Sequence, residues 1–156
     1  MKKISILIVT HFLFAMFGFV VGIYTLPIIT APNAPTEDEM ITASAQAEFT
    51  GQFKRDLKGS DFLHWGDGKI LVGRKFIVLE GSIAPGPDYN LYLSPKFVET
   101  ESEFKQLKST MIKVDAVRTF ENFIVAVSDS VDPSKFNTVI IWCESFGEFI
   151  SAAKYQ

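Results

Sequence analysis

A chain of 156 residues leaves room for one folded domain and an appendage, because single domains usually hold about 100–200 residues. The net charge at pH 7 is -3, and an acidic chain with scattered lysines lacks the basic surface that binding to a phosphate backbone needs, so we exclude nucleic acid as a partner. The only cysteine is Cys143, which excludes a disulfide within the chain; oxidation would join two chains or add a small thiol.

The N-terminal segment predicts a membrane helix. Residues 4–29 contain no charged side chain, and about 20 apolar residues are enough to cross a bilayer as a helix. The apolar part of a cleaved secretory signal is shorter, at roughly 7–15 residues, and small residues follow it closely. Here such a pair occurs at Ala43 and Ala45, too far from the apolar run. We therefore expect residues 1–29 to be an uncleaved anchor that binds the lipid bilayer through residues 4–29, with a cleaved signal as the alternative.

The basic residues predict how this anchor is oriented. Lys2 and Lys3 are the only lysines or arginines before Lys54. Basic flanks stay on the cytoplasmic side of a membrane helix, so the N-terminus should be cytoplasmic and the C-terminal domain extracytoplasmic. This predicts a single-pass protein of the cell membrane. Gly18 and Gly22 form a G-x-x-x-G pair that would let two such helices approach closely, which is one route to a homodimer.

The rest of the chain divides into two segments of different pattern. Residues 30–47 are rich in proline, alanine, threonine and acidic residues without apolar periodicity, which predicts a solvated stalk. Residues 48–156 consist of short β-type runs separated by turn residues, as in a sandwich or barrel. We expect strands at residues 49–53, 62–65, 69–72, 76–79, 89–93, 114–117, 123–127 and 138–143.

Turn signals and one helical pattern connect these strands. Residues 66–68 read Gly-Asp-Gly and predict a tight turn between the strands at 62–65 and 69–72. Residues 84–88 read Ala-Pro-Gly-Pro-Asp and predict a rigid turn. Residues 101–113 predict a short helix, with a surface connection as the alternative.

The run at residues 138–143 is the clearest strand. Its apolar side chains are consecutive, which is typical of a strand covered on both faces. Alternation places Ile141 and Cys143 on one face and Ile140 and Trp142 on the other. Together these patterns predict an all-β fold, an antiparallel β-sandwich preceded by one N-terminal transmembrane helix.

Two blocks carry a resemblance to a known family. A Gly-Pro-Asp turn at residues 86–88 leads into Leu-Tyr-Leu at 91–93, and about 50 residues later Val-Ile-Ile-Trp-Cys at 139–143 is followed by Phe146. In this order the blocks resemble the DM-thirteen domain, the DOMON-associated electron-transfer domain of Skeletor-type proteins, over almost all of residues 48–156. The resemblance implies a DOMON-like β-sandwich with one redox-active cysteine, here Cys143. The chain departs from the family around residues 113–123, where a glycine-rich segment is expected, and it has no DOMON or cytochrome module that would specify an electron donor and acceptor.

The candidate site residues each have two interpretations. Cys143 is the redox candidate, although free cysteines are often buried packing residues, and a neighbouring Glu144 would raise the thiol pKa. His64 could join Cys143 on copper or serve as an axial haem ligand, but no further ligands at metal-binding spacing are present, and a structural role is the alternative. Trp142, Asp88 and Phe146 are expected neighbours of the site, with Asp88 bonded to backbone amides of its turn.

Three functions are compatible with these patterns. The first is a membrane-anchored extracytoplasmic domain with a redox or electron-transfer role centred on Cys143, which would work with a redox partner protein. The second is a non-catalytic module that binds a ligand or protein and in which the cysteine is structural. The third is a homodimer linked through Cys143. No ordered hydrolytic constellation is visible, so we expect an accessory or binding domain rather than a stand-alone enzyme.

Overall fold

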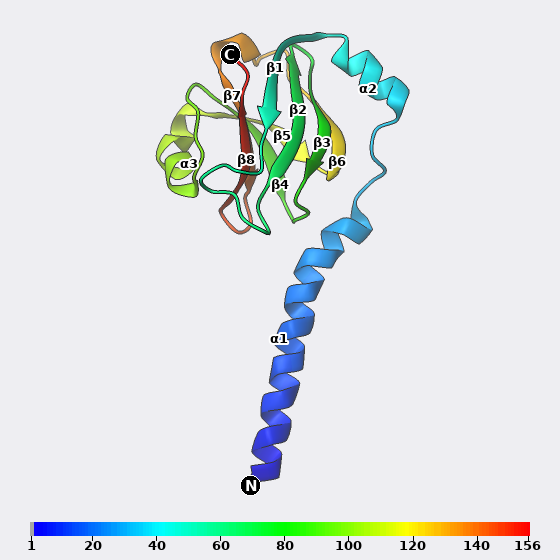
Figure 1. The fold of residues 1–156 in the computed structure, drawn as a ribbon, viewed down its shortest axis with the longest axis vertical. Coiled ribbons are helices and arrows are strands. Elements are labelled where there is room, and N and C mark those ends of the chain that lie inside the picture. The colour runs from blue at the N-terminus through cyan, green and yellow to red at the C-terminus, as the bar shows by residue number, and fades with distance from the viewer. Residues whose placement is uncertain (1) are drawn as a thin grey trace.

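The molecule consists of an apolar helix and a β-rich domain (Figure 1). The computed structural model describes residues 2–156. Helix α1 spans Lys2–Thr30, and by length and composition it could cross a membrane. None of the residues along this helix is buried against the domain. The apolar helix that the sequence predicts is therefore present.

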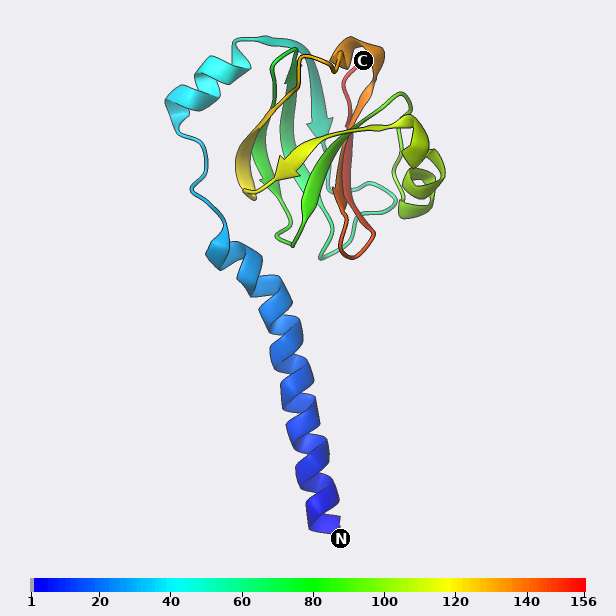
Figure 2. The same ribbon diagram turned by 180° about the vertical axis from the view of Figure 1, so that it is seen from behind.

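The domain is made of two antiparallel sheets of four strands each, which confirms the predicted β-sandwich. The sheets face each other when the molecule is seen from either side (Figures 1 and 2). The first sheet has the order β1-β2-β3-β6, with strands Ala47–Phe53, Gly66–Gly73, Phe76–Ile83 and Glu121–Ala126. The second has the order β5-β4-β7-β8, with strands Ile112–Val117, Tyr89–Ser94, Thr138–Cys143 and Glu148–Lys154.

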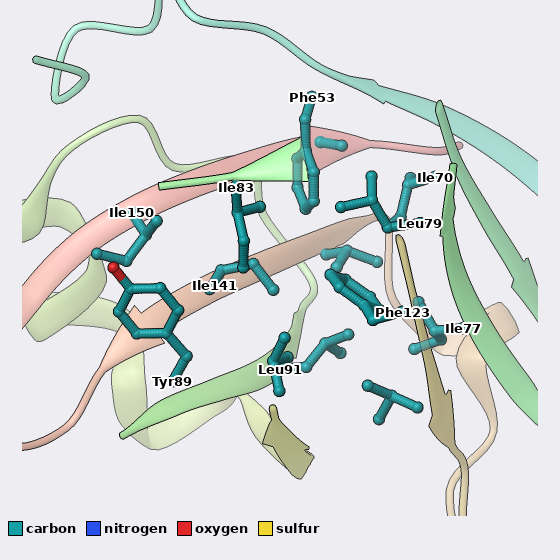
Figure 3. Packing of buried hydrophobic residues seen from close by; sticks show 14 of the residues in the cluster. Phe53, Ile70, Ile77, Leu79, Ile83, Tyr89, Leu91, Phe123, Ile141 and Ile150 are labelled. Atoms are coloured by element: carbon teal, nitrogen blue, oxygen red, sulfur yellow. The ribbon is translucent and has the colours of Figure 1, made fainter. Parts of the chain in front are cut away.

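The main core lies between the two sheets. Phe53, Leu79, Leu91 and Ile141 are fully buried there (Figure 3). Strand β7 is buried along its whole length, as the apolar run predicts. One of its faces joins the main core, and the other is covered by helix α3, Glu101–Leu107.

The prediction of a tight turn at residues 66–68 is wrong. These residues begin strand β2, residues 62–65 lie in the preceding loop, and the tight connection is the one between β2 and β3 at residues 74–75. Gly68 lies directly opposite Gly81 of β3, with φ of +133° and +159° respectively. A Cβ atom on Gly68 would stand 2.4 Å from the carbonyl oxygen of Glu80, so the glycines serve the close approach of two strands instead of a chain reversal.

The solvated stalk is also wrong for part of its length. Residues Glu37–Ser44 form helix α2, which begins with a capping box between Thr36 and Glu39. Ala43 on this helix is buried against Leu71 and Val78 on the outer face of the first sheet. Eight residues are too few for amphipathic periodicity to stand out, so the composition of the segment and its lack of apolar periodicity pointed to a solvated stalk.

Helix α3 is shorter than the pattern at residues 101–113 indicates. Helix α3 ends at Leu107, a 3-10 turn spans Lys108–Thr110, and β5 begins at Ile112. Phe104 is the fully buried residue of this helix. Leu107 and Met111 are partly buried against the same cluster, so the predicted apolar face exists even though the helix does not extend through it.

The edges of both sheets share one feature. Each outermost strand, β1, β5, β6 or β8, pairs with its neighbour through a register shift. The two central pairings, β2 with β3 and β4 with β7, run in continuous register. Irregular pairing is therefore confined to the edges.

Candidate functional site

The only cysteine of the chain ends strand β7, one face of which belongs to the main core. Cys143 is the final residue of β7 and is directly opposite Tyr89, the first residue of β4. Its side chain is part of the inter-sheet core and is 2% exposed. The sulfur donates a hydrogen bond to the carbonyl oxygen of Pro87, with 3.1 Å between Sγ and O. Alternation along β7 predicted this face correctly.

The turn that precedes β4 places the carbonyl acceptor. Asp88 has φ of +53°, a left-handed conformation that aspartate tolerates better than most residues. Its backbone oxygen accepts a hydrogen bond from the amide of Glu144, and its carboxylate accepts one from the hydroxyl of Ser145 at 2.7 Å. Asp88 thus joins the β3–β4 turn to the β7–β8 loop and fixes Pro87 beside the thiol. We expected its carboxylate to bond the amides of its own turn, and it bonds side chains instead.

The surroundings keep the thiol protonated. Burial raises the pKa of Cys143 above its ordinary value, and the carboxylates of Asp88 and Glu148 raise it further, against the opposing effect of backbone amides at residues 145–146. Sequence adjacency pointed to Glu144 as the acid that acts on the thiol. The Glu144 carboxylate is hydrogen-bonded on the other face of β7. The carboxylates that raise the pKa of the thiol are therefore those of Asp88 in the turn and Glu148 in β8.

The outer face of β7 has a separate polar cluster. The carboxylate of Glu144 accepts hydrogen bonds from the hydroxyl of Tyr92 and from the Lys108 ammonium, whose Nζ lies 2.8 Å from Oε2. Trp142 also belongs to this face, where its ring stacks on Phe104 with 3.9 Å between ring centroids. The structure therefore does not bring Trp142 together with Cys143.

This cluster gives a pH-dependent contribution to stability. Burial alone would raise the pKa of Glu144, but the hydrogen bonds from Lys108 and Tyr92 outweigh it and lower that pKa. A carboxyl with a lowered pKa stabilises the folded state above its unfolded pKa, and the stabilisation is lost as the pH falls through its folded value. We expect Glu144→Gln to destabilise the domain by about 1 kcal/mol at pH 7, since the pair is partly exposed, and by much less in acid.

The measurement is guanidinium unfolding of the full chain in a mild detergent at pH 7 and pH 3.5, followed by tryptophan fluorescence. Glu121→Gln is the matched control, because the Glu121 side chain is exposed and makes no hydrogen bond or ion pair within the described residues 2–156. A loss of stability in Glu144→Gln that is equal at both pH values would contradict the assignment.

An apolar cavity of about 570 Å³ adjoins the thiol. Cys143, Tyr89, Phe146 and His64 line it from the domain, and Val20 and Tyr24 line it from helix α1. Three of the predicted site residues, Cys143, His64 and Phe146, are thus brought together, although 79 positions separate His64 from Cys143 in the chain. A larger hollow of about 920 Å³ lies beside helix α2, and neither cysteine nor histidine is among its lining residues.

His64 is oriented by its own loop. Its Nδ1 lies 3.0 Å from a carboxylate oxygen of Asp61, and the other oxygen of that carboxylate accepts hydrogen bonds from the amides of Leu63 and His64. The hydrogen bond from His64 is the main reason why the pKa of Asp61 is lowered. With Nδ1 held in this way, Nε2 is the nitrogen that remains for another partner.

The side chains around the cavity suit the two predicted redox groups unequally. A copper site needs three or more convergent ligands, and residues 2–156 contain no group of three His, Cys, Asp or Glu side chains that could hold a metal ion. Copper therefore does not fit. A haem needs one axial ligand from the protein, and His64, through Nε2, is the residue in this cavity that would supply it.

Sequence reasoning missed two residues of the site. Tyr89 lies directly beside Cys143 on the neighbouring strand, β4, and Tyr24 lines the same cavity from helix α1. Alternation along residues 89–93 does place Tyr89 on a core face, but only the register between β4 and β7 reveals that its partner is the cysteine.

The comparisons with known proteins bear on the domain. A family model described as electron transfer DM13 matches residues 48–155, which is most of the chain and extends from β1 to β8. No curated protein and no solved structure matches the chain.

Proposed function

Because the chain belongs to the electron transfer DM13 family, we propose that it is a membrane-anchored electron-transfer domain whose redox group is Cys143. In this proposal residues 1–29 are the anchor, residues 30–47 connect it to the domain, and residues 48–156 are the working domain. The position of Lys2 and Lys3 before the apolar run supports an extracytoplasmic orientation.

The burial of Cys143 is the observation that decides between kinds of redox chemistry. Thiol–disulfide exchange requires a thiolate and direct access of a second sulfur. Cys143 is 2% exposed, and its surroundings raise its pKa, so it lacks both. Electron tunnelling requires the donor and the acceptor to be close, but it does not require direct contact between them. A buried thiol beside an apolar cavity is compatible with it.

The proposed step transfers one electron. The S–H bond of Cys143 breaks, one electron passes to a high-potential Fe(III) haem carrier of a partner protein, and the proton leaves to water by way of the Glu148 carboxylate, which lines the same cavity. The products are a thiyl radical and the reduced carrier. One electron and one proton, returned from a reduced carrier on the donor side, restore the thiol. The apolar neighbours keep a second thiol away from the radical.

The partner's carrier is the oxidant in this scheme, so the domain itself needs no bound metal to complete the cycle. A haem bound through His64 would add a second one-electron group beside the cysteine. No part of the step above depends on it.

A second function is favoured by the same burial. If Cys143 only packs, the domain is a ligand- or protein-binding module in which the apolar cavity holds the ligand. A dimer linked through Cys143 is disfavoured, because the sulfur would have to leave the core to reach a second chain.

Voltammetry of the full chain in detergent tests the proposal. We expect one reversible couple whose potential falls by about 59 mV per pH unit, as for one electron with one proton. The couple should be absent in Cys143→Ser. It should persist in Trp142→Phe, the matched control, since Trp142 is the redox-active neighbour in sequence and faces the opposite side of β7.

Thiol titration of the same samples tests the burial of Cys143 on which both functions rest, and the redox couple then separates them. Both require Cys143 to react with a bulky disulfide reagent only after guanidinium unfolding. If the titration shows a buried thiol and the wild-type chain shows no redox couple, electron transfer through Cys143 is refuted and the binding module is supported.

A further inference from the structure

Three large apolar side chains are exposed at one end of the sandwich. Phe62 is 91% exposed, Phe146 is 55% exposed and Leu63 is 46% exposed. Phe62 and Leu63 belong to the loop between β1 and β2, and Phe146 belongs to the loop between β7 and β8. We call these three residues the apolar tip. Exposed apolar groups that cluster in this way usually mark a surface that something covers.

The apolar tip lies beside the last turns of helix α1. All three tip residues line the 570 Å³ cavity whose opposite wall includes Val20, Ile23 and Tyr24. The loops at this end of the domain are the ones nearest to α1 in both views (Figures 1 and 2). The tip therefore adjoins residues 20–25 of the helix.

The length of α1 fixes where the membrane surface would cross it. The hydrocarbon core of a bilayer is about 30 Å thick, and a helix rises about 1.5 Å per residue, so about 20 residues span it. Counted from Lys3, which stays at the inner surface, the outer boundary falls near Ile23. Tyr24 suits this position, because tyrosine is enriched where the bilayer meets water. The helix segment that adjoins the apolar tip is thus the segment at the outer boundary.

We propose that the apolar tip inserts into the outer boundary of the lipid bilayer, so that the domain is held on the membrane by its own loops as well as by α1. The occupant of this surface is lipid. The inference goes beyond the proposed electron transfer and rests on one part of the proposed function, the insertion of α1. It places the cavity that contains Cys143 and His64 against the membrane, with the opposite end of the sandwich facing water.

The experiment uses the full chain in phosphatidylcholine vesicles. In a Cys143→Ser background, a single cysteine is introduced as Phe62→Cys or Phe146→Cys and labelled with an environment-sensitive fluorophore. Ser130→Cys is the matched control, because Ser130 is exposed in the loop after β6, away from the tip. Flotation and resistance to alkaline extraction report whether α1 is inserted. Iodide in the water and bromine on the lipid chains report the depth of each label.

We expect the labels at residues 62 and 146 to emit at shorter wavelength than the label at residue 130. They should be quenched several-fold less by iodide and measurably by the brominated lipid. If the chain floats and resists alkali but iodide quenches all three labels equally, the inference is overturned and the anchor stands. If the chain is extracted by alkali, the anchor fails and the inference fails with it. The control label excludes membrane binding by the fluorophore itself.

Discussion

Replacing Phe104 with alanine should lower the free energy of unfolding by about 3–5 kcal/mol, the usual cost of removing a fully buried aromatic ring. Phe104 is completely buried under the second sheet. Its ring stacks on Trp142, and it meets the ring of Tyr92 edge-on, with 5.2 Å between centroids. The cost is large because Phe104 is the buried residue through which α3 packs into this cluster.

The loss should extend to the helix. Helix α3 has seven residues, and an isolated helix of that length is not stable in water. The cap at Thr100, whose hydroxyl accepts a hydrogen bond from the amide of Glu103, orients the first turn but does not hold it to the sheet. Phe104 is the residue of α3 that is fully buried against the sheet, so Phe104→Ala should also expose the peptide bonds of residues 101–110 to protease.

Guanidinium unfolding of the full chain in detergent measures this effect. Both tryptophans, Trp65 and Trp142, lie in the β-domain, so their fluorescence reports on the domain without a contribution from α1. Phe97→Ala is the matched control, since Phe97 is in the same connection and is 40% exposed. Equal losses for Phe97→Ala and Phe104→Ala would show that α3 is not held through this ring.

A second large effect is expected where two strands approach most closely. In Gly68→Ala the new Cβ would lie 2.4 Å from the carbonyl oxygen of Glu80 and 2.6 Å from the Cα of Gly81. Both neighbours are backbone atoms of a central pairing, so neither can rotate away. Strain at φ of +133° adds roughly 1–3 kcal/mol, and overpacking adds roughly 1–3 kcal/mol. We expect a total loss of roughly 2–6 kcal/mol.

Gly147→Ala separates these two causes. Gly147 also has a positive φ, of +69°, but its nearest neighbour would stand 3.9 Å from the new Cβ. This variant should therefore lose only about 1 kcal/mol, from backbone strain. If Gly68→Ala unfolds at the same denaturant concentration as Gly147→Ala, the close approach of β2 and β3 contributes nothing, contrary to the geometry.

What the sequence predicted well was local in nature. Alternation along residues 138–143 placed Cys143 in the main core and Trp142 on the outer face, because the direction of successive side chains is fixed within one strand. The charge-free run at residues 4–29 predicted α1, since length and polarity alone decide whether a helix can span a bilayer.

What the sequence did not predict depends on contacts between distant segments. A Gly-Asp-Gly run is equally suited to a reversal and to a close strand pairing, and only the opposite glycine, Gly81, distinguishes them. Glu144 follows Cys143 in the chain, yet its partners are Tyr92 and Lys108 on the other side of the sheet. The carboxylates that act on the thiol are those of Asp88 and Glu148, which the fold brings near.

The register shifts at the sheet edges bear on how chains behave at high surface density. If α1 anchors the chain as proposed, the membrane confines the molecules to a plane, where collisions between neighbours are frequent and exposed strand edges are prone to join. Each outermost strand here is attached through an irregularity that bends and twists it, so its free backbone groups do not form a straight template. We therefore expect crowded copies to extend one another's sheets less readily than straight, regularly paired edge strands would.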